Sequence, residues 1–217
     1  FNTSSNKKVY LIGDSIMGSI SNDLKNKLLL KNYQFNTFTM GDCLFFPGFN
    51  RIDDLQTNSI SKKCNDDYFQ KIKETISKDD NSIIIIGGMI RKYTTLKNFD
   101  SKEGCLVHGS EPWNHKFESI YKTHNIKDSF IREGSKFSHN SKVIRIYTVP
   151  EICRDTNIEI IKKWVMRSDG WDSKISTIVS GSSKDFYDSS ISSFVLLTSV
   201  RGKSIYRVNS NKLLCVK

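Results

Sequence analysis

The chain has 217 residues, enough for one sizeable α/β domain with its own core, and its length does not require a second. Lys and Arg outnumber Asp and Glu by 33 to 23, a formal net charge of +10. The lysines are scattered over sequence that is typical of solvated helix faces, and no nucleic-acid motif interleaves them, so we expect no nucleic-acid partner. No stretch approaches the ~20 apolar residues of a membrane-spanning helix, and no cleavable signal begins at Phe1. Because the first residue is Phe rather than Met, we expect that the chain was cut from something longer.

Five apolar, β-branched or aromatic runs are predicted as strands, with room for a helix between most of them. They cover residues 9–12, 35–39, 82–87, 143–147 and 204–208. Several of these runs are continuously apolar, which is typical of strands that are covered on both faces, as in a parallel sheet.

Helical spacing of apolar residues predicts four helices between the strands. They cover residues 16–30, 65–77, 117–137 and 186–200, with Asn65 or Asp66 as a plausible cap of the second. Strands that alternate with helices favour right-handed βαβ units. We therefore expect a single domain over residues 1–217 with a flavodoxin-like, three-layer α/β/α fold built on five parallel strands.

Three segments, 40–64, 90–113 and 150–170, do not fit this alternation, and each follows a predicted strand. In open parallel sheets ligands bind outside the carboxyl ends of the strands, and long loops in compact domains are more often functional than decorative. We therefore expect a site at that edge of the sheet.

The five cysteines fit no Cys-x-x-Cys or Cys/His zinc spacing, so we expect no metal and no cofactor. Cys43 and Cys64 both lie in the segment after the second predicted strand, where a disulfide could tie a long excursion. Two interpretations of the cysteines remain open here: they are buried free thiols, or they form disulfides in an oxidised, exported domain. We predict a Cys43–Cys64 disulfide.

Residues 9–19 read VYLIGDSIMGS, a buried strand that ends on Gly13-Asp14-Ser15 and gives way to a helix. A serine at the first turn of that helix places its hydroxyl at the carboxyl edge of the sheet and its N–H among the unpaired donors of a helix start. This arrangement offers a nucleophile and part of an oxyanion hole. Asp14 can cap the helix or bond the neighbouring loop. The alternative is that Asp14 and Ser15 are only an N-cap pair.

The ends of the second and third predicted strands also carry glycines, at Gly41 and at Gly87-Gly88, with Arg91 shortly after. Glycines leave backbone N–H groups uncovered, and in the usual 2-1-3 strand order these turns flank Ser15. We expect Ser15, Gly41 and Gly88 to converge at the carboxyl edge.

An ordered set of residues follows the five strands. It comprises Gly13-Asp14-Ser15, then Gly41-Asp42-Cys43 with Phe46-Pro47-Gly48-Phe49, Cys64 opening a helix, Gly87-Gly88, Val149-Pro150-Glu151, and Leu213-Leu214-Cys215. This set resembles the SGNH (GDSL-like) hydrolases, and most closely the SGNH domain fused behind the multi-span membrane domain of acyltransferase-3 proteins, which O-acylate cell-surface glycans.

The resemblance implies an O-acyltransferase domain on the periplasmic or extracellular face of a membrane. Ser15 would take the acyl group, and the N–H groups of Ser15 and Gly41 with the turn from Gly88 to Arg91 would stabilise the oxyanion. Its partners would be an acyl donor, a glycan acceptor and the fused membrane domain. A free-standing esterase and a non-catalytic glycan-binding module remain alternatives.

The chain departs from the family pattern at three points. Ile16 stands where this branch often has His, and Met89 stands where a further oxyanion donor is usual, with Arg91 as a substitute. The family's Asp-x-x-His, the base and its orienter, is expected beyond Lys217, so the chain should be nearly inactive alone. The histidines present are poor replacements; they are His108, His115, His124 and His139, of which His108 is the first suspect.

Overall fold

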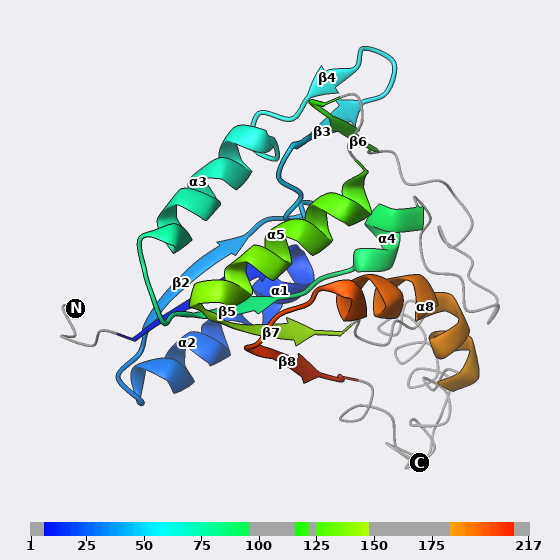
Figure 1. Cartoon of the computed structure of the whole chain (residues 1–217). Helices are drawn as coiled ribbons and strands as arrows, with labels where there is room; N and C mark the ends of the chain where they lie inside the picture. Colours follow the sequence, from blue (N-terminus) through cyan, green and yellow to red (C-terminus); the bar gives the residue numbers. More distant parts are fainter. Residues whose placement is uncertain (1–6, 96–115, 122–124, 148–182, 211–217) are drawn as a thin grey trace, which may run out of the picture.

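The structure is a computed structural model, and it describes residues 7–95, 116–121, 125–147 and 183–210 (Figure 1). Its main sheet holds five strands in the order β2-β1-β5-β7-β8, and every pairing is parallel. The strands are β1 (Lys8–Gly13), β2 (Gln34–Thr39), β5 (Ile83–Ile86), β7 (Lys142–Ile146) and β8 (Ile205–Val208). The predicted flavodoxin-like α/β fold with five parallel strands, in 2-1-3 order at its start, is confirmed.

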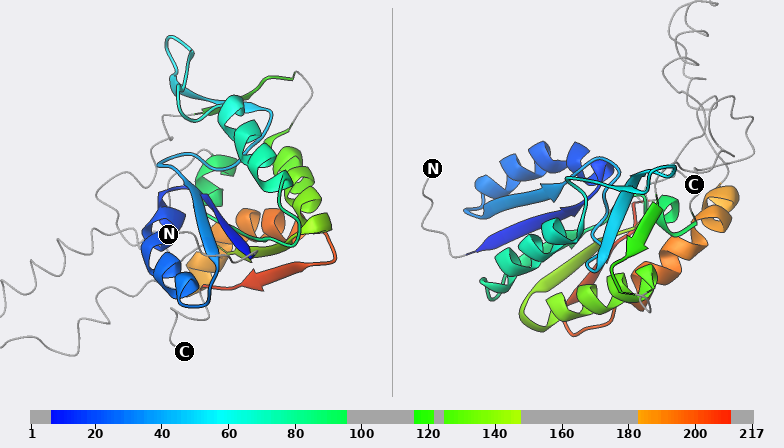
Figure 2. Two further views of the ribbon diagram at one scale, coloured as in Figure 1. Left: turned by 90° about the vertical axis from the view of Figure 1, so that its left-hand side faces the viewer. Right: turned by 90° about the horizontal axis from the view of Figure 1, so that it is seen from above.

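Both faces are covered at the centre of the main sheet, where β1 and β5 are buried, and alternate residues of a strand point to opposite sides. Val9 and Leu11 of β1 join one apolar cluster, and Tyr10 and Ile12 join the other. The first cluster packs under α1 (Ser15–Ser19) and α2 (Ser21–Leu29), and the second under α3 (Asp66–Ser77), α5 (Ile126–Asn140) and α8 (Ser183–Ser199). Figure 2 shows α1 and α2 on one side of the strands and α3 and α5 on the other.

The first two predicted helices form close to their expected positions. The helix expected over 16–30 is divided at Ile20 into α1 and α2. The helix α3 begins behind Asn65, whose side chain accepts a hydrogen bond from the N–H of Tyr68 at 3.1 Å. Phe69, Ile72 and Ile76 form the buried side of α3, as the helical spacing of apolar residues predicts.

The helix predicted over 117–137 is wrong in its first part. Residues Lys116–Ser119 form the strand β6, which pairs antiparallel with β3 (Phe49–Asp54). Phe117 packs edge-on against Phe46 and Tyr93, with ring centroids 5.2 and 5.9 Å apart. This long-range pairing outweighs the local helical spacing. The helix α5 begins only at Ile126, behind the cap residue Asn125.

The segment after β2 supplies β3 and β4 (Ser59–Ile60), which form a second, small sheet with β6 in the order β4-β3-β6. These strands lie together at the top of Figure 1, beyond the edge of the main sheet. A disulfide joins Cys43 and Cys64, whose Cα atoms are 5.8 Å apart, across 21 residues of sequence. In the chain-entropy model a loop of that length gives about 3 kcal/mol of stability. The disulfide therefore joins the start of this segment to its end, just before α3 begins.

Several sequence expectations fall on residues outside the described ranges, including Cys105, Cys153, Cys215, His108, His115 and His124. The remaining helix, α4 (Ile90–Thr95), follows β5 directly. Within the described residues, no helix combines the length and the hydropathy needed to cross a membrane.

Candidate active site

Three adjacent strands of the main sheet end next to one another. β1 lies between β2 and β5, and its pairing continues one residue past the end of β2, since the N–H of Met40 donates to the carbonyl of Gly13 at 3.2 Å. Ser15 follows β1, Gly41 follows β2 and Gly88 follows β5, each by two residues. The topology therefore brings the three candidate residues to the same carboxyl edge of the sheet.

Ser15 is the first residue of α1, and Asp14 is its N-cap. The serine is exposed, while its neighbours Asp14 and Met17 are buried. No hydrogen bond links the hydroxyl of Ser15 to another residue in the described part of the chain. As the first helical residue, Ser15 carries one of the N–H groups that an α-helix cannot satisfy internally. An accessible hydroxyl thus lies beside a backbone donor at the positive end of a helix.

Asp14 connects the helix α1 to the turn after β5. Its Oδ1 accepts from the N–H of Ile16 at 3.0 Å, and its Oδ2 accepts from the N–H of Met89 at 2.7 Å and from the hydroxyl of Tyr93 at 3.2 Å. Only 1% of the residue is exposed. Burial raises the pKa of the Asp14 carboxyl above its usual range, although these donors oppose the shift. Asp14 therefore serves both the helix cap and the neighbouring turn.

Packing or backbone conformation requires a glycine at the ends of β1 and β5. Gly88 has a φ of +139°, and a Cβ at this position would stand 2.8 Å from Oδ2 of Asp14. A Cβ on Gly13 would meet the side chain of Met17 at 2.4 Å, and one on Gly87 would meet the sulfur of Met17 at 2.8 Å. Gly13 and Gly87 therefore let α1 approach the sheet, and Gly88 lets the turn reach Asp14.

Gly41 differs from these glycines, because nothing lies within 4 Å of where its Cβ would be and its φ is not positive. It is the second residue of a turn in which the N–H of Cys43 donates to the carbonyl of Met40 at 3.3 Å. In a trans peptide the N–H points opposite the preceding carbonyl, so the N–H of Gly41 points out of the turn. Gly41 is exposed, and neither packing nor backbone conformation requires a glycine there.

The third residue of that turn, Asp42, has a φ of 53°, in the left-handed region that few residues other than Gly, Asn and Asp adopt. Two cations contact it. Nη1 of Arg51, on β3, donates to the carbonyls of Gly41 and Asp42 at 3.1 and 2.9 Å, and Nζ of Lys92, on α4, lies 2.7 Å from Oδ1 of Asp42. The sequence did not single out Arg51 or Lys92, because neither belongs to a recognisable motif.

The turn after β5 offers fewer oxyanion donors than the sequence suggested. The N–H of Met89 is already bonded to Asp14. Arg91, the second residue of α4, is half-buried. The sequence also missed Tyr93, which is 2% exposed; its pKa is raised by burial and by the charges of Asp14 and Asp42, so its hydroxyl stays a donor.

His139 is the one histidine in the described part of the chain, and it does not lie near Ser15. It is exposed, next to the last residue of α5 and shortly before β7 begins. Because all strands of the main sheet run parallel, this is the amino edge of the sheet, opposite Ser15. Among the described residues no three His, Cys, Asp or Glu side chains are grouped so that they could hold a metal ion.

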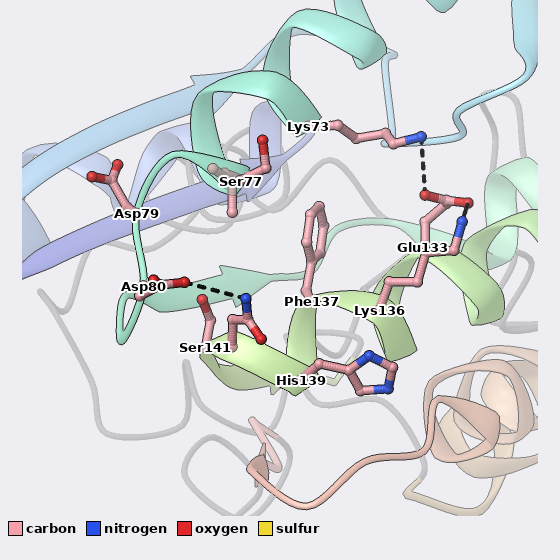
Figure 3. A pocket seen from close by; sticks show the side chains of 11 residues that line it. Lys73, Ser77, Asp79, Asp80, Glu133, Lys136, Phe137, His139 and Ser141 are labelled. Carbon is pink, nitrogen blue, oxygen red and sulfur yellow. Dashed lines mark hydrogen bonds and ion pairs between the residues drawn. The ribbon is translucent and has the colours of Figure 1, made fainter.

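A cavity of about 300 Å³ lies at the same end of the fold, between the last turns of α3 and α5 (Figure 3). Its charged side chains bind one another. Glu133 pairs with Lys73 at 3.1 Å and Lys136 at 3.0 Å, and Asp80 accepts from the amide of Asn140 at 3.2 Å. The cavity is remote from the serine edge, and the charged groups Lys73, Glu133 and Lys136 in its lining already have partners.

The comparisons with known proteins agree with this architecture. A family described as "SGNH domain (fused to AT3 domains)" matches residues 1–217. The search of curated proteins found no match. A solved structure, that of the periplasmic domain of a lipopolysaccharide acetyltransferase from Salmonella ser. Paratyphi A, is similar with a TM-score of 0.52 at 13% identity, over 100% of this chain and 70% of that one. At this identity the likeness shows the fold. Because the family match spans the chain, the protein belongs to the SGNH domains that are fused to AT3 domains.

Proposed function

We propose that this domain transfers an acyl group, such as acetyl, to a hydroxyl of a cell-surface glycan, outside the cytoplasm, with Ser15 as the nucleophile. The observation that carries the proposal is the exposed Ser15 at the first turn of α1, between the turns that follow β2 and β5. The family's fusion to AT3 domains supports a membrane acyltransferase as the source of the acyl group. The similar lipopolysaccharide acetyltransferase domain supports a glycan as the acceptor.

In the proposed reaction, Oγ of Ser15 attacks the carbonyl carbon of the acyl donor while a base takes its proton. The tetrahedral oxyanion is stabilised by the N–H groups of Ser15 and Gly41 and by donors of the turn from Gly88 to Arg91. Collapse of this intermediate breaks the bond to the donor's leaving group, which leaves with a proton. The glycan hydroxyl then attacks the acyl-serine and frees Ser15. We expect the base and its orienting carboxylate in an Asp-x-x-His sequence beyond Lys217.

The test compares three proteins in an ester hydrolysis assay: the 217-residue chain, a version extended past Lys217, and the extended version with Ser15→Ala. The extended protein should turn over the ester, and both of the others should fall by on the order of 10⁴ to 10⁶-fold, as when one member of a catalytic triad is lost. If the short chain is as fast as the extended one, the base lies within residues 1–217 and His108 is examined first. If Ser15→Ala keeps full turnover, the proposal is wrong.

A non-catalytic glycan-binding module is the second candidate, and the turn after β5 favours it. Met89 has no side-chain donor, and its N–H is bonded to Asp14, so this turn is a poorer oxyanion binder than the family pattern implies. The two candidates differ in one measurement. If the extended protein hydrolyses no ester, and Ser15→Ala leaves glycan affinity unchanged in calorimetry, the binding module is favoured.

A further inference from the structure

We propose that Arg51 and Lys92 are positioning residues that hold the turn of residues 40–43 in the conformation that directs the N–H of Gly41 toward the oxyanion. The inference rests on the proposed function for its catalytic meaning. Its structural part, a clamp on this turn, rests on contacts and on the backbone conformation of Asp42.

The backbone of Asp42 has an uncommon conformation. A turn with positive φ at its third residue is the kind that Gly or Asn normally supplies, and here an aspartate has a φ of 53°. A non-glycine residue in this region persists only when its surroundings fix it, and such residues cluster at functional sites. The neighbouring Gly41 has no need of glycine for packing. In the sequence Gly41-Asp42, the glycine therefore stands where space is open. The positive φ falls on Asp42, whose carboxylate and carbonyl are bound by cations.

Arg51 is placed to hold this backbone. Its Nη1 binds two consecutive carbonyls, those of Gly41 and Asp42, which fixes the orientation of both peptide planes. The guanidinium is itself held, since Nε lies 2.6 Å from Oδ1 of Asp53 and Nη2 donates to Oγ of Ser61 at 3.3 Å. Its side chain is only 13% exposed, so water competes weakly for these bonds.

Lys92 and the disulfide complete the clamp from other directions. Nζ of Lys92, 17% exposed in its side chain, binds the Asp42 carboxylate from α4, the helix whose Tyr93 also contacts Asp14. Cys43, the last residue of the turn, is bonded to Cys64. The turn is thus connected to the small sheet and to the Asp14 network around Ser15. A shift of about 1 Å in an oxyanion donor can cost on the order of 10²-fold in turnover.

The first experiment measures the conformation of the turn through the amide signal of Gly41. Selective ¹⁵N labelling of glycine gives 12 amide signals. In Arg51→Gln and in Lys92→Met the Gly41 signal should shift and broaden, while that of Gly134 in the helix α5 stays in place. Arg132→Gln, which removes a comparable ion pair from α5, is the matched control and should leave Gly41 unchanged. If Gly41 does not respond to Arg51→Gln, the clamp is disproved, whether or not the protein is an enzyme.

The second experiment separates positioning from stability by a double-mutant cycle in the extended protein. Arg51→Gln alone should lower kcat by roughly 10- to 100-fold with KM nearly unchanged, because the oxyanion and not the bound ester depends on Gly41. Asp42→Gly adopts the positive φ without strain, so adding Arg51→Gln to it should cost only about a few-fold. An equal loss in both backgrounds would overturn the positioning role.

The two experiments also distinguish failure of this inference from failure of the proposed function. If Ser15→Ala shows that no Ser15 chemistry exists, the proposed function fails, and the Gly41 signal alone decides the clamp. If Ser15 is essential but Arg51→Gln only lowers the melting temperature, with kcat intact, the proposed function stands and this inference is wrong.

Discussion

Asp14 makes the sharpest prediction about stability, because one buried carboxylate holds three donors. In Asp14→Ala the N–H groups of Ile16 and Met89 and the hydroxyl of Tyr93 lose their acceptor in a site that is 1% exposed. Loss of an N-cap side chain costs about 0.5–2 kcal/mol, and a buried donor left unpaired costs about 1–3 kcal/mol. Removing a costly buried charge and admitting water to the site offset part of the loss. We expect a net loss of about 2–4 kcal/mol in unfolding free energy.

Thermal unfolding of wild type, Asp14→Ala and Asp14→Asn measures this loss. For a domain of this size, about 2–4 kcal/mol corresponds to a decrease of about 4–10 °C in melting temperature. Asp14→Asn should lie between the other two, since Asn is also a good N-cap but has one acceptor oxygen instead of two. A melting temperature for Asp14→Ala within about 1 °C of wild type would refute the reasoning, because no buried network could then depend on this carboxylate.

The raised pKa of Asp14 adds a signature in pH. A folded-state pKa above the unfolded value of 3.8 means that the folded protein holds the proton more tightly. The associated stabilisation is complete below that value and is lost as the pH rises through the raised pKa. Asp14→Asn has no such titration. The difference in stability between wild type and Asp14→Asn should therefore be larger near pH 4 than near pH 7, and a difference that grows with pH would contradict the assignment.

Three further substitutions test other features of the fold. Gly41→Ala should leave the unfolding free energy within about 0.5 kcal/mol of wild type, because the added Cβ meets nothing within 4 Å. It should lower ester turnover of the extended protein by on the order of 10²-fold, because the Cβ would occupy space that the acyl group needs. Unchanged turnover would show that the acyl group does not bind beside Gly41. Gly88→Ala should lose about 1–3 kcal/mol in denaturant unfolding, because alanine disfavours its positive φ and crowds Asp14; wild-type stability would contradict this. Burial alone would raise the pKa of Glu133, but Arg132, Lys136 and Lys73 lower it overall. Glu133→Gln should therefore lower the unfolding free energy by about 1–3 kcal/mol at pH 7. This loss should shrink as the wild-type protein is acidified through the lowered pKa of Glu133. No loss at pH 7 would show that the three cations are fully solvated and do not stabilise the carboxylate.

The main sheet could be predicted from the sequence because its strands carry the signal locally. The central strands β1 and β5 are short apolar runs buried on both faces, and parallel strands place the residues that follow them at one edge. Ser15 and Gly41 reach that edge for this reason. Phe117 shows the limit of such reasoning, since its helical spacing was compatible with α5 until the pairing of β6 with β3 decided otherwise.

The sequence could not separate the roles of the glycines, since a glycine required by packing and one that leaves open space look alike. Coordinates distinguish Gly13, pressed against Met17, from Gly41, which has no neighbour within 4 Å. Nor could the sequence find the clamp. Lys92 is 50 residues from Asp42, and one basic residue among 33 carries no pattern until the fold brings it to its partner.

The occupied oxygens of Asp14 also constrain the mechanism. A carboxylate that orients a catalytic histidine must accept the imidazole N–H. Oδ1 of Asp14 is bonded to Ile16, Oδ2 is bonded to Met89 and Tyr93, and the residue is almost fully buried. Because only 1% of Asp14 is exposed, a histidine could reach its carboxylate only if the packing around it, including the turn after β5, rearranged. Despite its place beside Ser15, Asp14 therefore acts through the backbone. The proposed acyl transfer then requires that both the base and its orienting carboxylate come from other residues, as the expected Asp-x-x-His would supply.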